Sequence, residues 1–275
     1  MPMYDPKPLP KKALIAVPSA HAPFYPDNKE TGLFISEALH PYNVLTAAGF
    51  DVTFASETGS YVPDYLSTTS QYLAGSEKEQ YENLSSPFRA ALDSLSKSSD
   101  VNPDAYGIFF AAAGHAALLD YPSAHATARL AAKVYCDGGI TATVCHGAAL
   151  LPLAENLVTN SSIIVGKKVT GFTRQGEQEA GVLDTITRDW GAKLVEEYVT
   201  DAGAEYVSPP GPWDSFVQVD GRVVTGANPA SATATAEAAV KAFQNLENHQ
   251  DAEEGQGGKI ATHEDEGPGR RESEK

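Results

Sequence analysis

Short, continuous apolar runs alternate along this chain with longer segments whose apolar residues recur at helical spacing. The apolar runs have the length and composition of strands buried on both faces, and they occupy residues 12–19, 50–56, 106–114 and 140–144. The helical segments have apolar residues three or four positions apart, and they occupy residues 31–49, 121–139, 183–203 and 231–246. In the first of these helices Pro41 allows a break, and Gly49 ends the pattern. This alternation predicts an α/β fold, with a mostly parallel sheet covered by helices on both faces.

The later part of the chain adds smaller elements to this plan. Residues 165–173 predict an edge element, and residues 204–208 predict a further short strand. Residues 216–226 predict a hairpin with Asp220 and Gly221 at its turn.

Two stretches differ from the pattern because they are polar. Residues 59–100 are polar apart from one short helical pattern, so they predict a small cap insertion rather than part of the sheet. Residues 247–275 are rich in acidic residues and Gly, so they cannot bury enough apolar surface to offset the entropy of ordering. We therefore expect one folded domain over residues 1–246, followed by a disordered acidic tail.

Charge and cysteine content narrow the possible functions. The 275 residues carry a formal net charge of −16, which disfavours a nucleic-acid partner. The two cysteines, Cys136 and Cys145, cannot build a disulfide framework, so we expect a reducing compartment: the cytoplasm, with the nucleus as an alternative. No apolar run reaches the roughly 20 residues of a membrane span, and the first run is too short for a signal peptide. Because the sequence has no Gly-rich phosphate loop, we expect no nucleotide cofactor.

The run 140–144 ends in Cys145, His146 and Gly147, and small helix-forming residues follow. A strand that stops at a nucleophile and turns into a helix forms an elbow, which exposes that side chain at the carboxyl edge of a sheet. The helix N-terminus favours the thiolate form of a cysteine placed there. The alternative is a buried cysteine that packs as a small apolar side chain. The adjacent His146 and the flanking Gly favour the catalytic interpretation.

Five segments carry a resemblance to a known superfamily, and they are residues 31–59, 109–122, 143–151, 169–177 and 211–232. They resemble the ThiJ/PfpI (DJ-1) superfamily, and within it the fungal heat-shock-inducible branch of glutathione-independent glyoxalase III proteins (D-lactate dehydratases). The resemblance implies a flavodoxin-like three-layer sandwich with a small cap, related to class I glutamine amidotransferases. It also implies a homodimer that converts a small dicarbonyl, methylglyoxal, to D-lactate without a cofactor.

The resemblance also assigns roles to residues. Cys145 is the nucleophile, and His146 is the neighbouring histidine, which would act as general base and acid. Glu177 is the third member of a triad, and it would orient His146. Glu37, on the helix after the first strand, would stay protonated and donate to the thiolate, because a second negative charge there is unfavourable. The residues expected to bind the substrate oxygen are Gly114, His115 and Gly147.

The sequence also departs from the superfamily pattern. Arg174 follows Gly-Phe-Thr where an acidic residue is usual, and it could alter the entrance of the pocket. Ala148 follows the elbow where Pro is more usual. Bacterial relatives bind a metal with two histidines and a carboxylate; His115, His125 and His146 lack that spacing, so we predict no metal site.

Two other classes of function stay open at this point. The superfamily also includes stress-response holdase chaperones, which need an exposed apolar patch rather than a cysteine. A different thiol enzyme would use the same nucleophile: a deglycase, an amidase or peptidase, or a tailoring enzyme acting on a larger carbonyl compound. Trp213 is interpreted as a packing anchor and Cys136 as a bystander.

Overall fold

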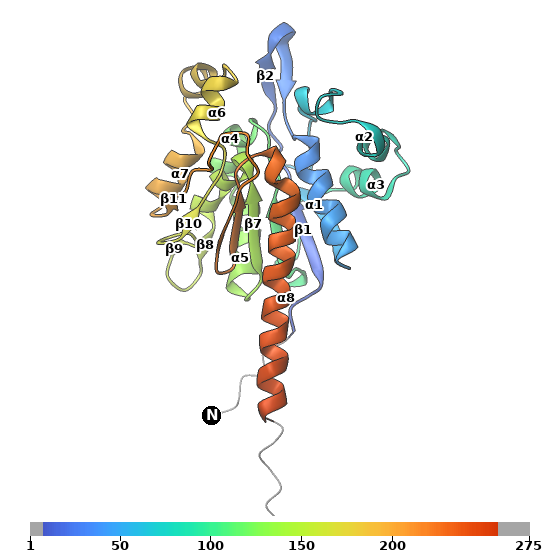
Figure 1. The fold of residues 1–275 in the computed structure, drawn as a ribbon, viewed down its shortest axis with the longest axis vertical. Coiled ribbons are helices and arrows are strands. Elements are labelled where there is room, and N and C mark those ends of the chain that lie inside the picture. The colour runs from blue at the N-terminus through green and yellow to red at the C-terminus, as the bar shows by residue number, and fades with distance from the viewer. Residues whose placement is uncertain (1–7, 258–275) are drawn as a thin grey trace, which may run out of the picture.

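A seven-stranded sheet forms the centre of the computed structural model, which describes residues 8–257 (Figure 1). The strand order is β12-β13-β7-β6-β1-β4-β5, and every neighbouring pair is parallel except β12 with β13. The strands are β1 (Lys12–Ala16), β4 (Asp51–Ser56), β5 (Ser96–Lys97), β6 (Ile108–Ala111), β7 (Ile140–Val144), β12 (Val217–Asp220) and β13 (Val223–Gly226). All side chains of β6 and β7 are buried, which explains why these runs are continuously apolar.

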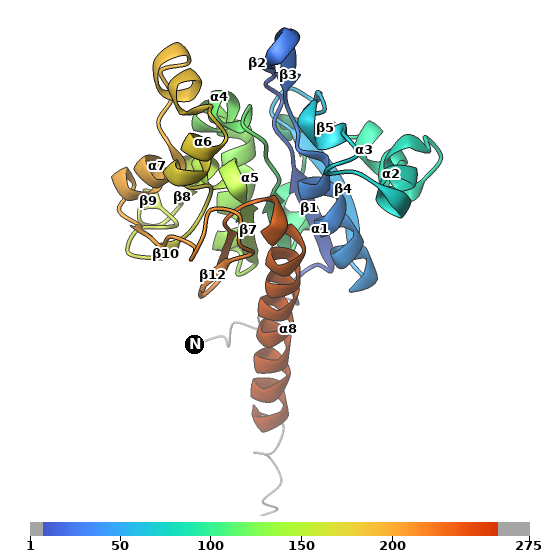
Figure 2. The same ribbon diagram turned by 45° about the horizontal axis from the view of Figure 1, so that its top comes forward.

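Helices cover both faces of this sheet, as the sequence predicted. Helices α1 (Ile35–Ala47) and α8 (Ala232–Gly257) lie side by side on one face, and α5 (His125–Cys136) packs on the other (Figures 1 and 2). The remaining α-helices are α2 (Gly75–Glu82), α3 (Pro87–Asp93), α4 (Ala117–Asp120), α6 (Arg174–Glu179) and α7 (Val195–Asp201). Within residues 8–257 no helix is long and apolar enough to cross a lipid bilayer.

Three small two-stranded sheets lie outside the central one. They pair β2 (Ala22–Tyr25) with β3 (Lys29–Thr31), β8 (Glu155–Asn156) with β9 (Ser161–Ser162), and β10 (Lys168–Val169) with β11 (Glu205–Tyr206). The β2–β3 hairpin follows β1 directly, so it stands beyond the carboxyl edge of the sheet (Figure 1). The sequence pattern did not predict this hairpin.

Two predicted helices differ from expectation. Pro41 is buried inside α1 and does not break it, because packing against β1 and α8 compensates for the one hydrogen bond that a proline cannot donate. The segment 183–203 is not one helix: a π-helical turn at Thr185–Asp189 is separated from α7 by Gly191, whose φ of 63° is left-handed.

The cap and the tail have boundaries in the structure that differ in part from those expected. Most of the stretch 59–100 lies outside the sheet and carries α2 and α3, but Ser96–Lys97 pairs with β4 as the edge strand β5. Helix α8 continues past residue 246, so residues 247–257 are helical rather than irregular. The rest of the expected tail, 258–275, lies outside the described residues.

Candidate active site

Cys145 occupies a sharp turn at the carboxyl end of β7. Its φ is 59°, which is uncommon for a residue with a side chain, and a 3-10 helix (Cys145–Leu153) begins at this residue. A Cβ on Gly147 would lie 2.6 Å from the carbonyl oxygen of Ala111, so only glycine lets this helix pack so closely on β6. The expected strand–cysteine–helix elbow is therefore present, with a strained nucleophile position.

A chain of hydrogen bonds starts at the Cys145 side chain. Its Sγ lies 3.2 Å from Nδ1 of His146, and Nε2 of His146 lies 2.8 Å from Oε1 of Glu177. The ring and the carboxylate are almost completely buried. Because a carboxylate only accepts, Nε2 of His146 carries the hydrogen, which leaves Nδ1 free to accept the thiol proton. The three side chains have the order and polarity of a catalytic triad.

Glu177 reaches this position from the first turn of α6. Thr173 is the N-cap of this helix, and its hydroxyl accepts from the backbone N–H of Gly176 at 2.9 Å. The second oxygen of Glu177 accepts from Nε2 of His115 at 3.0 Å. One carboxylate is thus shared by two imidazoles, a contact that the sequence reasoning did not foresee for His115.

The charges around Glu177 set its pKa and that of His146. Burial alone would raise the pKa of Glu177, but the two imidazoles outweigh it and hold this pKa at about 2. Burial lowers the pKa of His146, the Glu177 carboxylate opposes that shift, and His115 lowers it further. An ionised Glu177 and a neutral His146 at neutral pH are the states that a general base needs.

Glu37 approaches Cys145 from the first turn of α1. Its Oε2 accepts from the backbone N–H of Ala113 at 2.9 Å, whereas its Oε1 has no hydrogen-bond partner in the described part of the chain. Complete burial raises the pKa of Glu37 to about 8, so its carboxyl keeps its proton at neutral pH. A protonated carboxyl is the state that the predicted donor to the Cys145 sulfur requires.

The Cys145 thiol itself differs from expectation. Burial raises its pKa well above the ordinary value, and negative charge on Glu37 would raise it further. Burial therefore opposes the effect of the helix N-terminus on the Cys145 thiol. The structure favours a thiol that transfers its proton to His146 as it attacks.

Not all of the other residues predicted to belong to the site line the cavity. Gly114 and His115 line the cavity above Cys145, but Gly147 does not. A Cβ on Gly114 would lie 2.2 Å from the carbonyl oxygen of Gly32, and its φ is 145°, so this position also requires glycine. Arg174 does not line the cavity: it pairs with Glu196 and Glu197 at 3.5 and 3.3 Å. Arg174 therefore does not alter the pocket entrance by lining it, as the sequence suggested it could.

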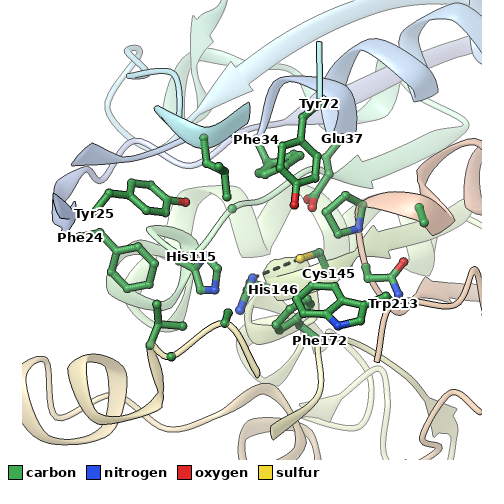
Figure 3. Close-up of a pocket in the computed structure, with 18 of the residues that line it drawn as sticks. Phe24, Tyr25, Phe34, Glu37, Tyr72, His115, Cys145, His146, Phe172 and Trp213 are labelled. Atoms are coloured by element: carbon green, nitrogen blue, oxygen red, sulfur yellow. Dashed lines mark hydrogen bonds between the residues drawn. The ribbon is translucent and has the colours of Figure 1, made fainter. Parts of the chain in front are cut away.

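The cavity has a volume of about 740 Å³ and opens over Cys145 (Figure 3). Sequence reasoning missed most of its walls, because they come from loops and from the unpredicted β2–β3 hairpin. Trp213, which was interpreted as a packing anchor, lines the cavity while 49% exposed. The aromatic side chains in the walls are Phe24, Tyr25, Phe34, Tyr72, Phe172 and Trp213.

Two histidines and a carboxylate also meet here in a set that could hold a metal ion. The ligand atoms of His115, His146 and Glu177 all lie within 4.8 Å of one another. The expectation that the histidines lack this arrangement considered His125, which lies on α5, and did not anticipate that Glu177 would join His115 and His146. In the structure each oxygen of Glu177 is paired with one imidazole, so the three groups satisfy one another.

This chain is similar to known fungal proteins over most of its length. No family model matches the chain. Glutathione-independent glyoxalase HSP31 of Saccharomyces cerevisiae is 42% identical over 236 residues, which are 86% of this chain and 99% of that protein. The crystal structure of glyoxalase III from Candida albicans has a TM-score of 0.82 at 43% identity, and the match covers 84% of this chain and 97% of that one.

A more distant structure shows the fold alone. The ThiJ/PfpI domain protein from Brachyspira murdochii has a TM-score of 0.51 at 14% identity, over 86% of this chain and 98% of that one. At the identity and coverage of the fungal proteins, this chain belongs to the family of glutathione-independent glyoxalases within the DJ-1/ThiJ/PfpI fold.

Proposed function

We propose that this protein converts methylglyoxal to D-lactate without glutathione, through a covalent adduct on Cys145. One observation carries the proposal: at the base of the cavity the thiol lies 3.2 Å from a His146 nitrogen that is free to accept its proton. Glu177 orients that imidazole by accepting the hydrogen bond from its Nε2. Membership of a glyoxalase family supports a small 2-oxoaldehyde as the substrate.

In the first step the Cys145 sulfur adds to the aldehyde carbon. The thiol proton passes to Nδ1 of His146 and from there to the aldehyde oxygen, which gives a hemithioacetal and leaves His146 neutral for the next step. Glu37, protonated beside the sulfur, stabilises the thiolate as it forms and then has a proton to give. Backbone N–H groups of Gly114 and His146 are the proposed donors to the developing oxyanion.

In the second step His146 removes the hydrogen from the former aldehyde carbon. The electron pair forms an enediolate, which is protonated at the adjacent carbon to give a thioester of the 2-hydroxy acid. One carbon is oxidised and its neighbour is reduced, so no external oxidant is needed. Water then cleaves the thioester, releases lactate and returns the proton to the sulfur.

Replacement of Cys145 tests the proposal. Cys145→Ala and Cys145→Ser should each lose roughly 10³-fold or more in methylglyoxal turnover measured without glutathione, because neither supplies a nucleophilic sulfur. Cys136→Ala is the matched control, since Cys136 is a half-buried cysteine on α5 that does not line the cavity. It should keep full activity. Turnover within a few-fold of the native enzyme in Cys145→Ser would exclude this mechanism.

We also propose two finer points on the resemblance alone: the enzyme is a homodimer, and it works in the cytoplasm. Light scattering after size-exclusion chromatography measures the first, and a mass equal to one 29.1 kDa chain would reject it. Subcellular fractionation measures the second.

A further inference from the structure

The cavity above Cys145 is larger than methylglyoxal requires. Its volume of about 740 Å³ lies in the range of pockets that enclose drug-sized ligands. Methylglyoxal carries only a methyl group beside its two carbonyls, and both carbonyls must reach Cys145 and the backbone of Gly114. A substrate of this size fills only part of that volume.

The walls around this remaining space are aromatic and held in place. Phe24 stacks on Trp190 with ring centroids 4.9 Å apart, and its ring centroid lies 4.6 Å from that of His115. Phe172 meets Trp213 edge to face at 5.6 Å, and its ring centroid lies 5.8 Å from that of His115. Figure 3 shows Phe172 and Trp213 on the Cys145 side of the two histidines and Phe24 on the other side. Such walls favour an aromatic ring, which they can contact on its face and on its edge.

The electrostatics of the cavity exclude an anionic group. None of the lining residues in the described part of the chain is Lys or Arg. Glu37 lines the cavity as a protonated, neutral carboxyl, and the buried Asp64 accepts from the hydroxyl of Tyr25, another lining residue, at 2.9 Å, so neither supplies a positive charge. A carboxylate or phosphate on the substrate would lose its hydration without gaining a partner.

We propose that the preferred substrate is a neutral 2-oxoaldehyde with an aromatic ring on its ketone carbon, seated against the aromatic walls of the cavity that include Phe24 and Trp213. The inference rests on the proposed function, since the carbonyl chemistry at Cys145 is unchanged. Sulfur adds to the aldehyde carbon, the hydride equivalent moves to the ketone carbon within the substrate, and water releases an aromatic 2-hydroxy acid. Atoms and electrons balance with water as the only co-reactant.

Three substrates measured without glutathione test the inference: methylglyoxal, phenylglyoxal and 4-carboxyphenylglyoxal. In the native enzyme, kcat/KM for phenylglyoxal should exceed that for methylglyoxal by about tenfold or more, the discrimination that added apolar contact in a pocket provides. The carboxylated compound should be poorer than phenylglyoxal by about tenfold or more, although its reacting carbons are the same.

Variants separate contact with the walls from intrinsic reactivity. Trp213→Ala should reduce the ratio of phenylglyoxal to methylglyoxal kcat/KM at least about fivefold; the side chain is 49% exposed, so its loss leaves the core intact. Phe24→Leu on the opposite wall should act in the same direction. Leu84→Ala removes an exposed apolar side chain outside the cavity and should leave the ratio unchanged. Ala180→Lys adds a cation at an exposed lining position and should improve the carboxylated substrate relative to phenylglyoxal.

The outcomes distinguish the two proposals. Turnover of methylglyoxal with a phenylglyoxal ratio of one or less in the native enzyme would overturn this inference and leave the glyoxalase proposal standing. A high ratio that neither Trp213→Ala nor Phe24→Leu changes would overturn the assignment of the aromatic walls. No turnover of any 2-oxoaldehyde would reject the proposed function and this inference with it.

Discussion

At the scale of single residues, the site depends on protonation states set by burial. Glu37 keeps a proton because its carboxyl is completely buried, Glu177 loses its proton because two imidazoles surround it, and His146 stays neutral. Two carboxyl groups close to one nucleophile therefore have opposite roles, one as a donor and the other as an acceptor. Each state predicts a separate dependence on pH.

Glu37 predicts a loss of activity at alkaline pH. Its pKa is about 8, so the protonated donor beside Cys145 disappears as the pH rises through that value. We expect kcat to fall above about pH 8 in the native enzyme. Glu37→Gln keeps a donor but cannot transfer a proton, so it should lose most turnover at every pH. Glu37→Leu also loses the donor, and its Cys145 pKa, followed by thiolate absorbance, should rise above that of Glu37→Gln.

The same carboxyl predicts a pH-dependent stability. Its pKa is raised in the folded state, so the folded protein binds the extra proton, and the free energy of unfolding falls as the pH rises from about 4.5 to about 8. The largest slope from one such group is about 1.4 kcal/mol per pH unit. Glu37→Gln should lack this contribution, which denaturant titrations at several pH values measure. Equal pH dependence in both proteins would mean that Glu37 ionises normally.

Replacing His115 should shift the acid limb of the pH profile of kcat/KM. This imidazole lowers the pKa of His146, and it also hydrogen-bonds Glu177. His115→Gln retains an N–H donor for Glu177 but removes the imidazole that lowers the pKa of His146, so that pKa should rise. The acid limb of kcat/KM should then move to higher pH, because the neutral base forms later. His21→Gln, which removes a surface histidine paired with Glu30, is the control and should leave the limb in place.

At the scale of elements, three segments distant in sequence bring the chemistry to one place. The 3-10 helix after β7 supplies Cys145 and His146, the first turn of α1 supplies Glu37, and the first turn of α6 supplies Glu177. The 3-10 helix follows β7 of the central sheet, whereas α1 follows the short strand β3 and α6 follows the short strand β10. Small changes in how these elements pack should therefore affect catalysis.

The contact between the 3-10 helix and β6 predicts the effect of a single added methyl group. In Gly147→Ala the new Cβ would meet the carbonyl oxygen of Ala111 at 2.6 Å, so the helix must move. We expect a loss of roughly 1–3 kcal/mol in the free energy of unfolding, and a lower kcat because His146 is displaced. Gly75→Ala adds a methyl group where nothing lies within 4 Å and should keep native kcat. Native activity in Gly147→Ala would contradict the packing argument.

At the scale of the whole molecule, α8 joins the compact α/β body to the acidic C-terminal part of the chain. Among residues 232–248, the part of α8 whose burial the structure describes, the buried side chains end at Phe243, and Leu246 is the last apolar residue that packs against the core. Figure 1 shows the remaining turns of α8 extending away from the sheet. We therefore propose that residues 1–246 contain the complete folded domain.

Truncation after Leu246 tests that boundary. The shortened protein should keep native kcat and lose less than roughly 0.5 kcal/mol of stability, as for other surface changes away from the core. Thermal melts followed by circular dichroism, together with methylglyoxal assays, provide the measurements. A large fall in melting temperature would show that the acidic segment contributes to the fold.

The sequence by itself determined the layered α/β plan and the turn at Cys145 between a strand and a helix. Continuous apolar strands and amphipathic helices are local patterns, and the abrupt end of a buried strand at Cys145 and His146 is also local, so both could be read directly. The resemblance added Glu37 and Glu177, which lie in the first turns of helices. Local patterns failed where packing overrides propensity, as at Pro41 inside α1 and at the π-helical turn after Leu183.

Only the tertiary structure decided how the site is completed. Glu177 is shared by His115 and His146, which lie 62 and 31 positions from it along the chain. Hydrophobic periodicity is a local pattern, so it does not predict contacts at such separations. The raised pKa of Cys145 follows from burial by side chains of several elements, which outweighs the helix N-terminus that was visible in the sequence. The aromatic cavity likewise forms where the β2–β3 hairpin and several loops meet, so its size and the absence of Lys and Arg among its described lining residues come from the fold.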